Sequence, residues 1–410
     1  MNSTIRTFNP SISLPDGAPA TARTVFKLLQ RLQFGSLDVQ LPDGSSAHFG
    51  NTAEGPRAAL RIRDWALCGA VMRSGDIGFA ESFMAGHWTS PDLFALLELF
   101  LRNRDALESM VYGHWWGALL YRARHLLNRN SRAGSRKNIH AHYDLGNSFY
   151  KLWLDDSMNY SSGLFDGDAS RSLPAAQDAK MRRALSECAL QPGQRVLEIG
   201  CGWGAIAECA ARDFDAHLTG VTLSKEQLAW GQQRLKDTGL ADKADLRFQD
   251  YRDITDEPFD AIVSIEMFEA VGREYWDGYF KTVYDKLKPG GRACIQSITI
   301  RDDLFERYTR SSDFIQQYIF PGGLLPSPSQ FRLHAEKAGL RVVNELAFGA
   351  CYAETLKRWR EAFLRHEGPV REQGFDTRFM RLWEFYLAYC EAAFATGNTD
   401  VMQFTLVREV

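Results

Sequence analysis

The sequence lacks the features that tie a protein to an oxidising compartment, a structural metal or the interior of a bilayer. Its seven cysteines are an odd number and form no C-x-x-C pair, so neither a disulfide framework nor a zinc ribbon is expected. The pair His140-x-His142 has no third ligand at a suitable spacing, so no metal is predicted. The best apolar run, residues 91–101, is too short to span a bilayer and carries Asp92 and Glu98. With no apolar signal-peptide core, the chain is expected in the cytoplasm.

Strong charge of one sign is also missing from the chain as a whole. The 48 Lys and Arg residues against 51 Asp and Glu residues give a formal net charge of −3. Bulk electrostatic capture of nucleic acid needs a broad basic surface, so no nucleic-acid partner is expected.

Acidic residues are absent from one stretch, residues 109–143. This stretch contains aromatic and then basic side chains: Trp115, Trp116, Tyr121, Arg122, Arg124, Arg129, Arg132, Arg136 and Lys137. Such an order resembles an interfacial segment that faces anionic lipid headgroups. A solvated linker with its tryptophans packed in a core is the other interpretation, and the sequence leaves both open.

The length of 410 residues suits two domains. Early in the chain, residues 36–49 alternate apolar and polar residues around Pro42-Asp43-Gly44, which predicts a hairpin, and Ser90-Pro91-Asp92 predicts the start of a helix capped by Ser90. Later, strand patterns alternate with helical stretches, which predicts a doubly wound α/β sheet with mostly parallel strands. The predicted strands are residues 195–200, 216–221, 244–249, 259–266, 292–300, 340–346 and 401–409.

The first of these strands runs into a glycine-rich turn, Gly200-Cys201-Gly202-Trp203-Gly204, and then a predicted helix, residues 205–212. Glycine allows a tight turn and lets a ligand lie against the backbone. The spacing is G-x-G-x-G rather than G-x-G-x-x-G, and no phosphate-binding lysine follows. This favours S-adenosylmethionine over a dinucleotide or ATP, although a glycine turn alone is a weak signal.

Glu198-x-Gly200-x-Gly202 resembles the first motif of class I methyltransferases, in which the acidic residue lies near the methionine amino group. Residues 288–292, KPGGR, and Phe259-Asp260 fit later turns and strands of the same fold. One position departs from that pattern, because the second strand does not end in the usual acidic residue but continues as GVTLSKEQ, residues 220–227.

This departure narrows the resemblance from class I methyltransferases in general to one group among them. GVTLS-x-x-Q, HYDLGNSFY (142–150), MNYSSGLF (158–165), MFEAVG (267–272) and YIFPGGLLPS (318–327) resemble cyclopropane-fatty-acyl-phospholipid synthases and mycolic acid methyltransferases. The resemblance implies a smaller N-terminal α+β, sterol-carrier-like domain that handles lipid (1–125), a basic linker (126–139) and a methyltransferase domain that binds S-adenosylmethionine (140–410).

The same resemblance implies the contacts of the methyl donor. Hydroxyl and amide groups after the second strand would replace the missing acid at the ribose, and Asp250 would lie near the adenine, with a loop-capping role as the alternative. The implied donor residues are Tyr160, Ser161, Glu198, Gly200, Cys201, Gly202, Thr222, Leu223, Ser224, Gln227, Asp250 and Tyr251.

For the acceptor, the resemblance implies a bound bicarbonate as base, held by Cys, Glu, His, an Ile backbone and Tyr. Glu269, Ile298 and Tyr352 match, whereas Ser162 and Gln296 stand where the family has Cys and His. Serine and glutamine can donate hydrogen bonds but cannot carry a proton at neutral pH. We call these five groups the anion cradle. Glu266, just before MFEAVG, is either an alternative acid or a cap.

The predicted function is transfer of a methyl carbon from S-adenosylmethionine to the double bond of an unsaturated phospholipid acyl chain, forming a cyclopropane. The altered cradle keeps a methyl-branched or furan-type product open, and a small-molecule or sterol methyltransferase is the weaker alternative. The expected partners are unsaturated phospholipid acyl chains at the inner face of the membrane, where the protein would be peripheral. A homodimer is a possible assembly.

Overall fold

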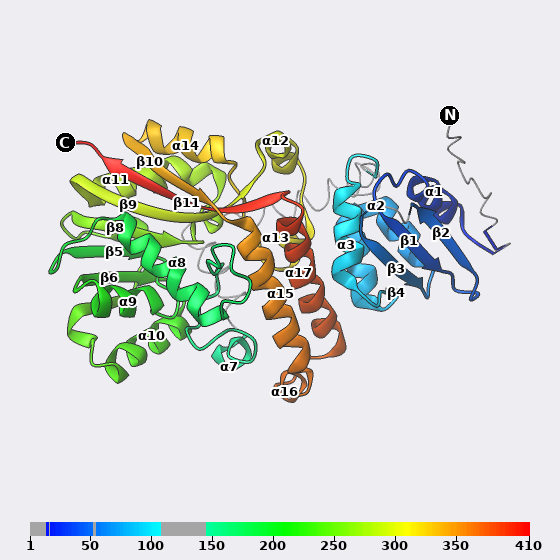
Figure 1. Ribbon diagram of the computed structural model, residues 1–410, viewed down its shortest axis with the longest axis horizontal. Helices are drawn as coiled ribbons and strands as arrows, with labels where there is room; N and C mark the ends of the chain where they lie inside the picture. Colours follow the sequence, from blue (N-terminus) through cyan, green and yellow to red (C-terminus); the bar gives the residue numbers. More distant parts are fainter. Residues whose placement is uncertain (1–13, 16, 52–54, 108–144) are drawn as a thin grey trace. The chain divides into compact units, whose positions relative to one another are not determined.

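The structure, a computed structural model, describes residues 14–15, 17–51, 55–107 and 145–410 (Figure 1). The chain divides into two compact units, residues 1–117 and 118–410. The acid-free stretch 109–143, with the predicted linker 126–139 and His140-x-His142, lies outside the described residues. Within the described residues no helix is both long and apolar enough to cross a membrane.

The first unit is a small α+β structure whose sheet has the order β2-β1-β3-β4. The predicted hairpin is confirmed, because β1 and β2 pair antiparallel with Leu37 opposite Phe49, while β1 and β3 are parallel. Its elements are α1 (Ala20–Leu29), β1 (Ser36–Gln40), β2 (Ser46–Gly50), β3 (Arg57–Ile62), α2 (Ala66–Ala85), β4 (Trp88–Thr89) and α3 (Leu93–Arg102).

The start of α3 corrects one detail of the sequence prediction. The helix is capped by Asp92, whose side chain accepts a hydrogen bond from the Ala95 amide at 3.0 Å, and Ser90 and Pro91 precede it. Ser90 instead donates its hydroxyl to the Ala59 carbonyl of β3. Asp92 caps better here because its carboxylate is one residue from the first helical turn.

The second unit holds a seven-stranded sheet of the order β10-β11-β9-β8-β5-β6-β7, in which only β11 runs antiparallel to its neighbours (Figure 1). All seven predicted strands are confirmed: β5 (Arg195–Ile199), β6 (His217–Thr222), β7 (Ala244–Phe248), β8 (Phe259–Ile265), β9 (Leu287–Ile300), β10 (Leu340–Ala347) and β11 (Thr399–Arg408). The fold class predicted from sequence is therefore correct for this unit.

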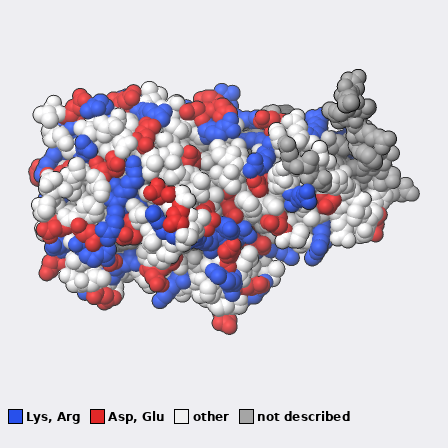
Figure 2. Space-filling view, viewed as in Figure 1, with Lys and Arg blue, Asp and Glu red and all other residues white. Residues whose placement is uncertain are grey.

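The helices of the second unit lie between and after these strands. They are α7 (Asn147–Tyr150), α8 (Leu173–Glu187), α9 (Ala205–Asp213), α10 (Lys225–Asp237), α11 (Trp276–Lys286), α12 (Asp302–Arg310), α13 (Phe314–Tyr318), α14 (Pro328–Lys337), α15 (Gly349–Arg365), α16 (Glu367–Glu372) and α17 (Thr377–Ala395). Basic and acidic side chains are interspersed on the face drawn in Figure 2.

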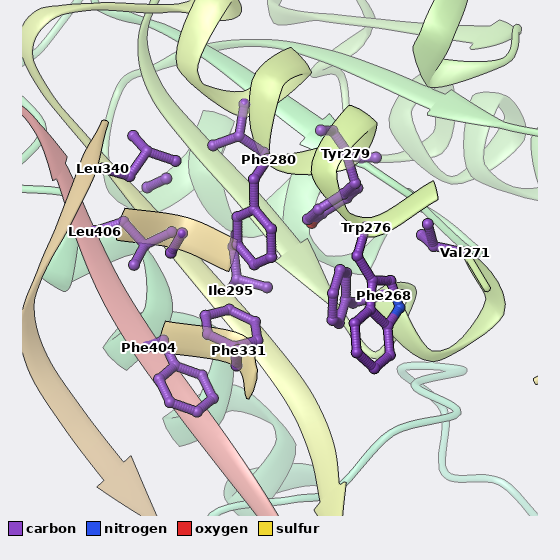
Figure 3. Close-up of a cluster of buried hydrophobic side chains, with 14 of the residues drawn as sticks. Phe268, Val271, Trp276, Tyr279, Phe280, Ile295, Phe331, Leu340, Phe404 and Leu406 are labelled. Atoms are coloured by element: carbon purple, nitrogen blue, oxygen red, sulfur yellow. The ribbon is translucent and has the colours of Figure 1, made fainter. Parts of the chain in front are cut away.

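Successive residues of the central strands enter two different cores, as expected for a sheet covered on both faces. Leu197 packs with residues of α11 and α14, while its neighbour Val196 packs with residues of α8 and α9. The first of these cores is rich in aromatic rings, with Phe331 stacked on Phe404 at 3.9 Å (Figure 3). Phe268 is fully buried in the same core, so it anchors the loop that follows β8.

Candidate active site

The predicted donor and acceptor residues meet at one edge of the central sheet. After β5 the chain proceeds outward to β6 and β7, then returns to β8 on the other side of β5. At such a reversal of strand order, α/β sheets bind ligands beside the carboxyl ends of the strands, here β5 and β8. The glycine turn follows β5, and Glu266 follows β8.

The glycine turn has the geometry of a ligand-binding loop. The Gly200 and Cys201 amides both donate to the Val221 carbonyl at 3.0 Å, which fixes the turn to β6. Gly202 has φ +48°, and a Cβ placed on it would meet no atom of the described residues within 4 Å. Open space therefore faces the turn at Gly202, and Gly204 is the N-cap residue of α9.

Glu198 supplies a buried acid beside this turn. Burial raises the pKa of its carboxyl to about 8, opposed by the charge of Lys180. Its Oε2 is buried and has no hydrogen-bond partner among the described residues. A positively charged amino group bound here would give this oxygen a donor and favour the ionised form of Glu198, so the site fits the methionine end of S-adenosylmethionine.

The chain after β6 forms a small polar cluster. The Thr222 hydroxyl donates to Gln227 Oε1 at 3.2 Å and accepts from the Ser224 amide at 3.2 Å. Ser224 caps α10, and Leu223 between them is half-buried. Thr222, Ser224 and Gln227 thus come together as predicted, and their contact with a ribose stays a prediction.

Asp250 has a structural role that the sequence offered as the alternative. Its carboxylate accepts from the Arg252 amide at 3.0 Å and from the Arg252 guanidinium at 2.8 and 2.6 Å. Tyr251 packs edge-on against Tyr279, 5.6 Å between ring centroids. Both residues follow β7 at the same sheet edge, and their role at the adenine stays a prediction.

The loop carrying Tyr160 and Ser161 is held by α8. Gln177 donates its side-chain amide to the Ser161 carbonyl at 2.8 Å, and Lys180 donates to the Ser161 hydroxyl at 2.5 Å. Lys180 is fully buried, and burial lowers the pKa of its amine to about 8 against the charges of Glu266, Asp155 and Glu198. The Lys180 amine thus interacts both with residues of the donor site, Ser161 and Glu198, and with Glu266 near the anion cradle.

Sequence reasoning missed Lys180. Its signal is positional, because Ala176, Lys180 and Ala184 recur every four residues on the buried side of α8. A lysine in such an apolar stripe is rare unless it is paired.

Aromatic rings surround Tyr160. Its hydroxyl lies 2.6 Å from that of Tyr386, and its ring is 5.4 Å from Trp153 and 5.5 Å from Trp359. Phe320, which belongs to the motif YIFPGGLLPS, is 6.5 Å away. Such faces stabilise a cation by roughly 0.5–2 kcal/mol each. Trp153, Trp359 and Tyr386 were not predicted from sequence.

Other aromatic residues of the family motifs belong to cores. Phe149 and Phe268 are fully buried, and Phe165 is buried. Tyr143 lies outside the described residues.

The anion cradle is assembled around Glu266. Its Oε1 accepts from the Ser162 amide at 2.9 Å and from the Gln296 side-chain amide at 2.7 Å. Its Oε2 accepts from the Tyr352 hydroxyl at 2.7 Å. Three of the five predicted groups therefore donate to Glu266. From the sequence, Glu266 was expected only as an alternative acid or a cap.

The remaining two groups of the cradle bind each other. Glu269 Oε1 accepts from the Ile298 amide, and from the Ser297 hydroxyl at 3.1 Å. Glu269 Oε2 is buried with no hydrogen-bond partner in the part of the chain that the structure describes. Glu269 is thus beside Glu266 but outside its hydrogen-bond set.

A chain of amides fixes the orientation of Gln296. Arg183 donates to Gln403 Oε1 at 2.5 Å, so the Gln403 nitrogen faces Gln296 and donates to its Oε1 at 2.9 Å. The Gln296 nitrogen is then left to donate to Glu266. Since an amide has one donor end and one acceptor end, this network selects the donor end for Glu266.

The two carboxyls have different environments. Burial and the charge of Glu266 raise the pKa of Glu269 to about 8. Burial also raises the pKa of Glu266, but Lys180 and the three hydrogen bonds oppose that rise. Two adjacent carboxyls cannot both ionise easily, so the better-stabilised one holds the charge. Lys180 and the three hydrogen bonds thus favour the ionised form at Glu266 more than at Glu269, whose pKa is raised to about 8.

Comparison with known proteins identifies the family of this chain. A family profile described as mycolic acid cyclopropane synthetase matches residues 130–404. The tuberculostearic acid methyltransferase UfaA1 of Mycobacterium tuberculosis is 40% identical over 87% of this chain and 85% of its own. The cyclopropane-fatty-acyl-phospholipid synthase of Escherichia coli is 34% identical over 86% of this chain and 88% of its own.

Solved structures give the same result. The complex of the mycolic acid cyclopropane synthase CmaA1 with SAH and CTAB matches with a TM-score of 0.62 and 33% identity, covering 66% of this chain and 97% of CmaA1. The chain therefore belongs to the mycolic acid cyclopropane synthetase family, and it is an S-adenosylmethionine-dependent methyltransferase of lipid acyl chains.

Proposed function

We propose that this enzyme methylates the double bond of an unsaturated phospholipid acyl chain and releases a methyl-branched, unsaturated product. S-adenosylmethionine supplies the methyl group, whose carbon bonds to the alkene π electrons as the C–S bond breaks and its electron pair stays on sulfur. The neighbouring alkene carbon becomes a cation. The aromatic rings around Tyr160 stabilise this cation and keep water away from it.

The position of the base decides the product. Loss of a proton from the added methyl group closes a cyclopropane, whereas loss from a neighbouring chain carbon leaves a methyl-branched alkene. Only three of the five cradle groups hold Glu266, while Ile298 is bound to Glu269. Since Ser162 and Gln296 stand where the family's Cys and His would help to hold the base, a base with changed surroundings supports loss of the proton from a chain carbon instead. The methyltransferase name of the 40% identical relative favours the same outcome.

Product analysis tests this function. The enzyme would be incubated with S-adenosylmethionine and vesicles of a dioleoyl phospholipid, and the fatty acids would then be released. Ring and branch products are isomers, each one CH2 heavier than the substrate. Mild hydrogenation adds two hydrogens to the branched alkene but leaves a cyclopropane intact. A product that resists hydrogenation would support the cyclopropane synthase instead, and no mass gain would refute both.

A phospholipid substrate requires that the enzyme bind a membrane surface. We propose that the first unit and the acid-free stretch, residues 109–143, bind that surface. Neutralising Arg129, Arg132, Arg136 or Lys137 should each weaken binding to anionic vesicles by on the order of 1 kcal/mol. Equal sedimentation with anionic and neutral vesicles would instead favour a plain linker.

A further inference from the structure

The side chain that fills the anion cradle belongs to the protein itself. The Ser162 amide, the Gln296 amide and the Tyr352 hydroxyl all donate to the Glu266 carboxylate, between 2.7 and 2.9 Å. We propose that Glu266 is the catalytic base and takes the place of bicarbonate, so that turnover needs no bicarbonate. Because the proposed methyl transfer creates the cation that needs a base, this assignment depends on that function.

A separate small anion does not fit the cradle as built. Ser162 and Gln296 are fully buried, and Tyr352 is 6% exposed. Their donor groups already point at Glu266, and the Ile298 amide points at Glu269. An incoming bicarbonate would have to displace a carboxylate from three hydrogen bonds and leave it buried without them, which is strongly unfavourable.

The backbone at Glu266 has an uncommon conformation, which it shares with four other non-glycine residues of the described chain. Its φ is +49°, in the left-handed region that residues other than glycine rarely adopt. The Glu266 amide donates to the Gln296 carbonyl at 2.8 Å, which locks this turn to β9. Left-handed backbone at a non-glycine residue is unfavourable and is found more often at functional sites. The residue with this backbone is also the one whose carboxylate the three donors hold.

Glu266 also meets the chemical demands on a base. It is half-buried, so part of its surface stays uncovered, whereas its Ser162 and Gln296 donors are fully buried. The buried Lys180 amine favours its ionised form, whereas the pKa of its neighbour Glu269 is raised to about 8. A charged base beside a protonated acid is a division of roles seen where two carboxyls share a site.

The proton-transfer step balances without another reactant. After methyl transfer, a carbon beside the cationic carbon loses a proton to a Glu266 oxygen. The electrons of that C–H bond form the new double bond and neutralise the cation. Glu266 becomes a neutral carboxylic acid and later releases the proton to water, so one proton leaves in each turnover.

Three proteins test the assignment in buffer freed of carbon dioxide and in the same buffer with added bicarbonate. They are the wild type, Glu266→Gln, and Glu257→Gln as a control at an exposed glutamate before β8. We expect equal wild-type turnover in both buffers. Glu266→Gln keeps the side-chain shape and should lose about 100- to 10,000-fold in turnover, as expected for loss of a general base. Calorimetric binding of S-adenosylmethionine should be unchanged in all three, which reports on folding.

Two outcomes would overturn the assignment: a wild type that stops without bicarbonate, or a Glu266→Gln enzyme with full turnover. Both outcomes require that the wild type methylates the phospholipid, so they leave the proposed function intact. A wild type that binds S-adenosylmethionine but never methylates an acyl chain would refute that function instead. Glu266→Gly provides a second check, because it empties the cradle and relieves the strain. Added bicarbonate should restore at least part of its turnover, and no gain would count against a cradle vacated by Glu266.

Discussion

The donor turn and the anion cradle lie at the same sheet edge but keep their family pattern to different degrees. At the donor turn, Gly200, Cys201 and Gly202 match the motif residue by residue, and open space remains at Gly202. In the cradle, Ser162 and Gln296 replace the family's Cys and His, and Glu266 fills the space between them. The donor turn follows the family's motif in sequence, whereas the cradle departs from it at two positions.

The difference follows from what each region is made of. The turn is built from backbone, and a Cβ on Gly200 would lie 2.8 Å from Met267. Few substitutions can satisfy such a constraint. The cradle is built from side chains that only need to present donors to an anion, so a carboxylate on the protein can replace a bound one if its partners change with it. Regions of the second kind can change their chemistry within an unchanged fold.

The largest expected effect is at the donor turn. Gly202→Val should lower the affinity for S-adenosylmethionine by at least about 100-fold, or roughly 2.7 kcal/mol, because its branches enter the open space and its backbone is left-handed. Gly239→Val is the matched control, since Gly239 also has a positive φ and open surroundings. Calorimetry should find normal affinity in the control. Normal affinity in Gly202→Val would show that the donor lies elsewhere.

The next effect is on the response of turnover to bicarbonate. It distinguishes a cradle occupied by Glu266 from one that has simply lost its anion. Ser162→Cys with Gln296→His and Glu266→Gly should create an enzyme whose turnover rises about ten-fold or more with bicarbonate, since a base regained by a site typically changes rates by such factors. The double change with Glu266 retained should stay indifferent to bicarbonate, because the carboxylate still occupies the cradle. A double variant that responds as strongly as the triple one would show that Glu266 does not block the anion.

The same contrast governs what could be predicted from sequence. The strands and the glycine turn are local patterns, so they were predicted within a few residues. The partners of Glu266 are not local, since Ser162 and Tyr352 lie 104 and 86 residues away in the sequence. The resemblance named Ser162, Gln296 and Tyr352 but not the Glu266 carboxylate that they share, because a substitution is visible in sequence whereas the side chain placed beside it is visible only in the fold.

Lys180 connects the two regions, and its loss should affect them unequally. Lys180→Met removes the charge that favours ionised Glu266, so the acid limb of the turnover–pH profile should move up by about one unit, a ten-fold loss on that limb. Since burial lowers the pKa of Lys180 to about 8, wild type and variant should converge above that pH. The exposed Lys236→Met is the control. A uniform loss at every pH would mean that Lys180 acts only through packing.

The smallest expected effect is on the stability of the protein rather than on its activity. Its dependence on pH distinguishes which of the two neighbouring carboxyls, Glu266 or Glu269, holds the proton. In the unfolded chain Glu269 ionises near its ordinary pKa of 4.5, whereas the folded protein holds its proton up to about 8. The folded state therefore binds more protons within this window, and its stability falls as the pH rises through it.

Glu269→Gln cannot ionise, so it should lose less stability than the wild type between about pH 6 and about pH 8, by on the order of 1 kcal/mol. Part of the trend should persist, because Glu198 also has a pKa of about 8. Urea unfolding followed by tryptophan fluorescence measures the difference, with Glu257→Gln as the exposed control. If Glu269→Gln follows the wild-type dependence, Glu269 is already ionised in the folded protein. Glu266 would then be the protonated member of the pair, and the roles of the two carboxyls would be reversed.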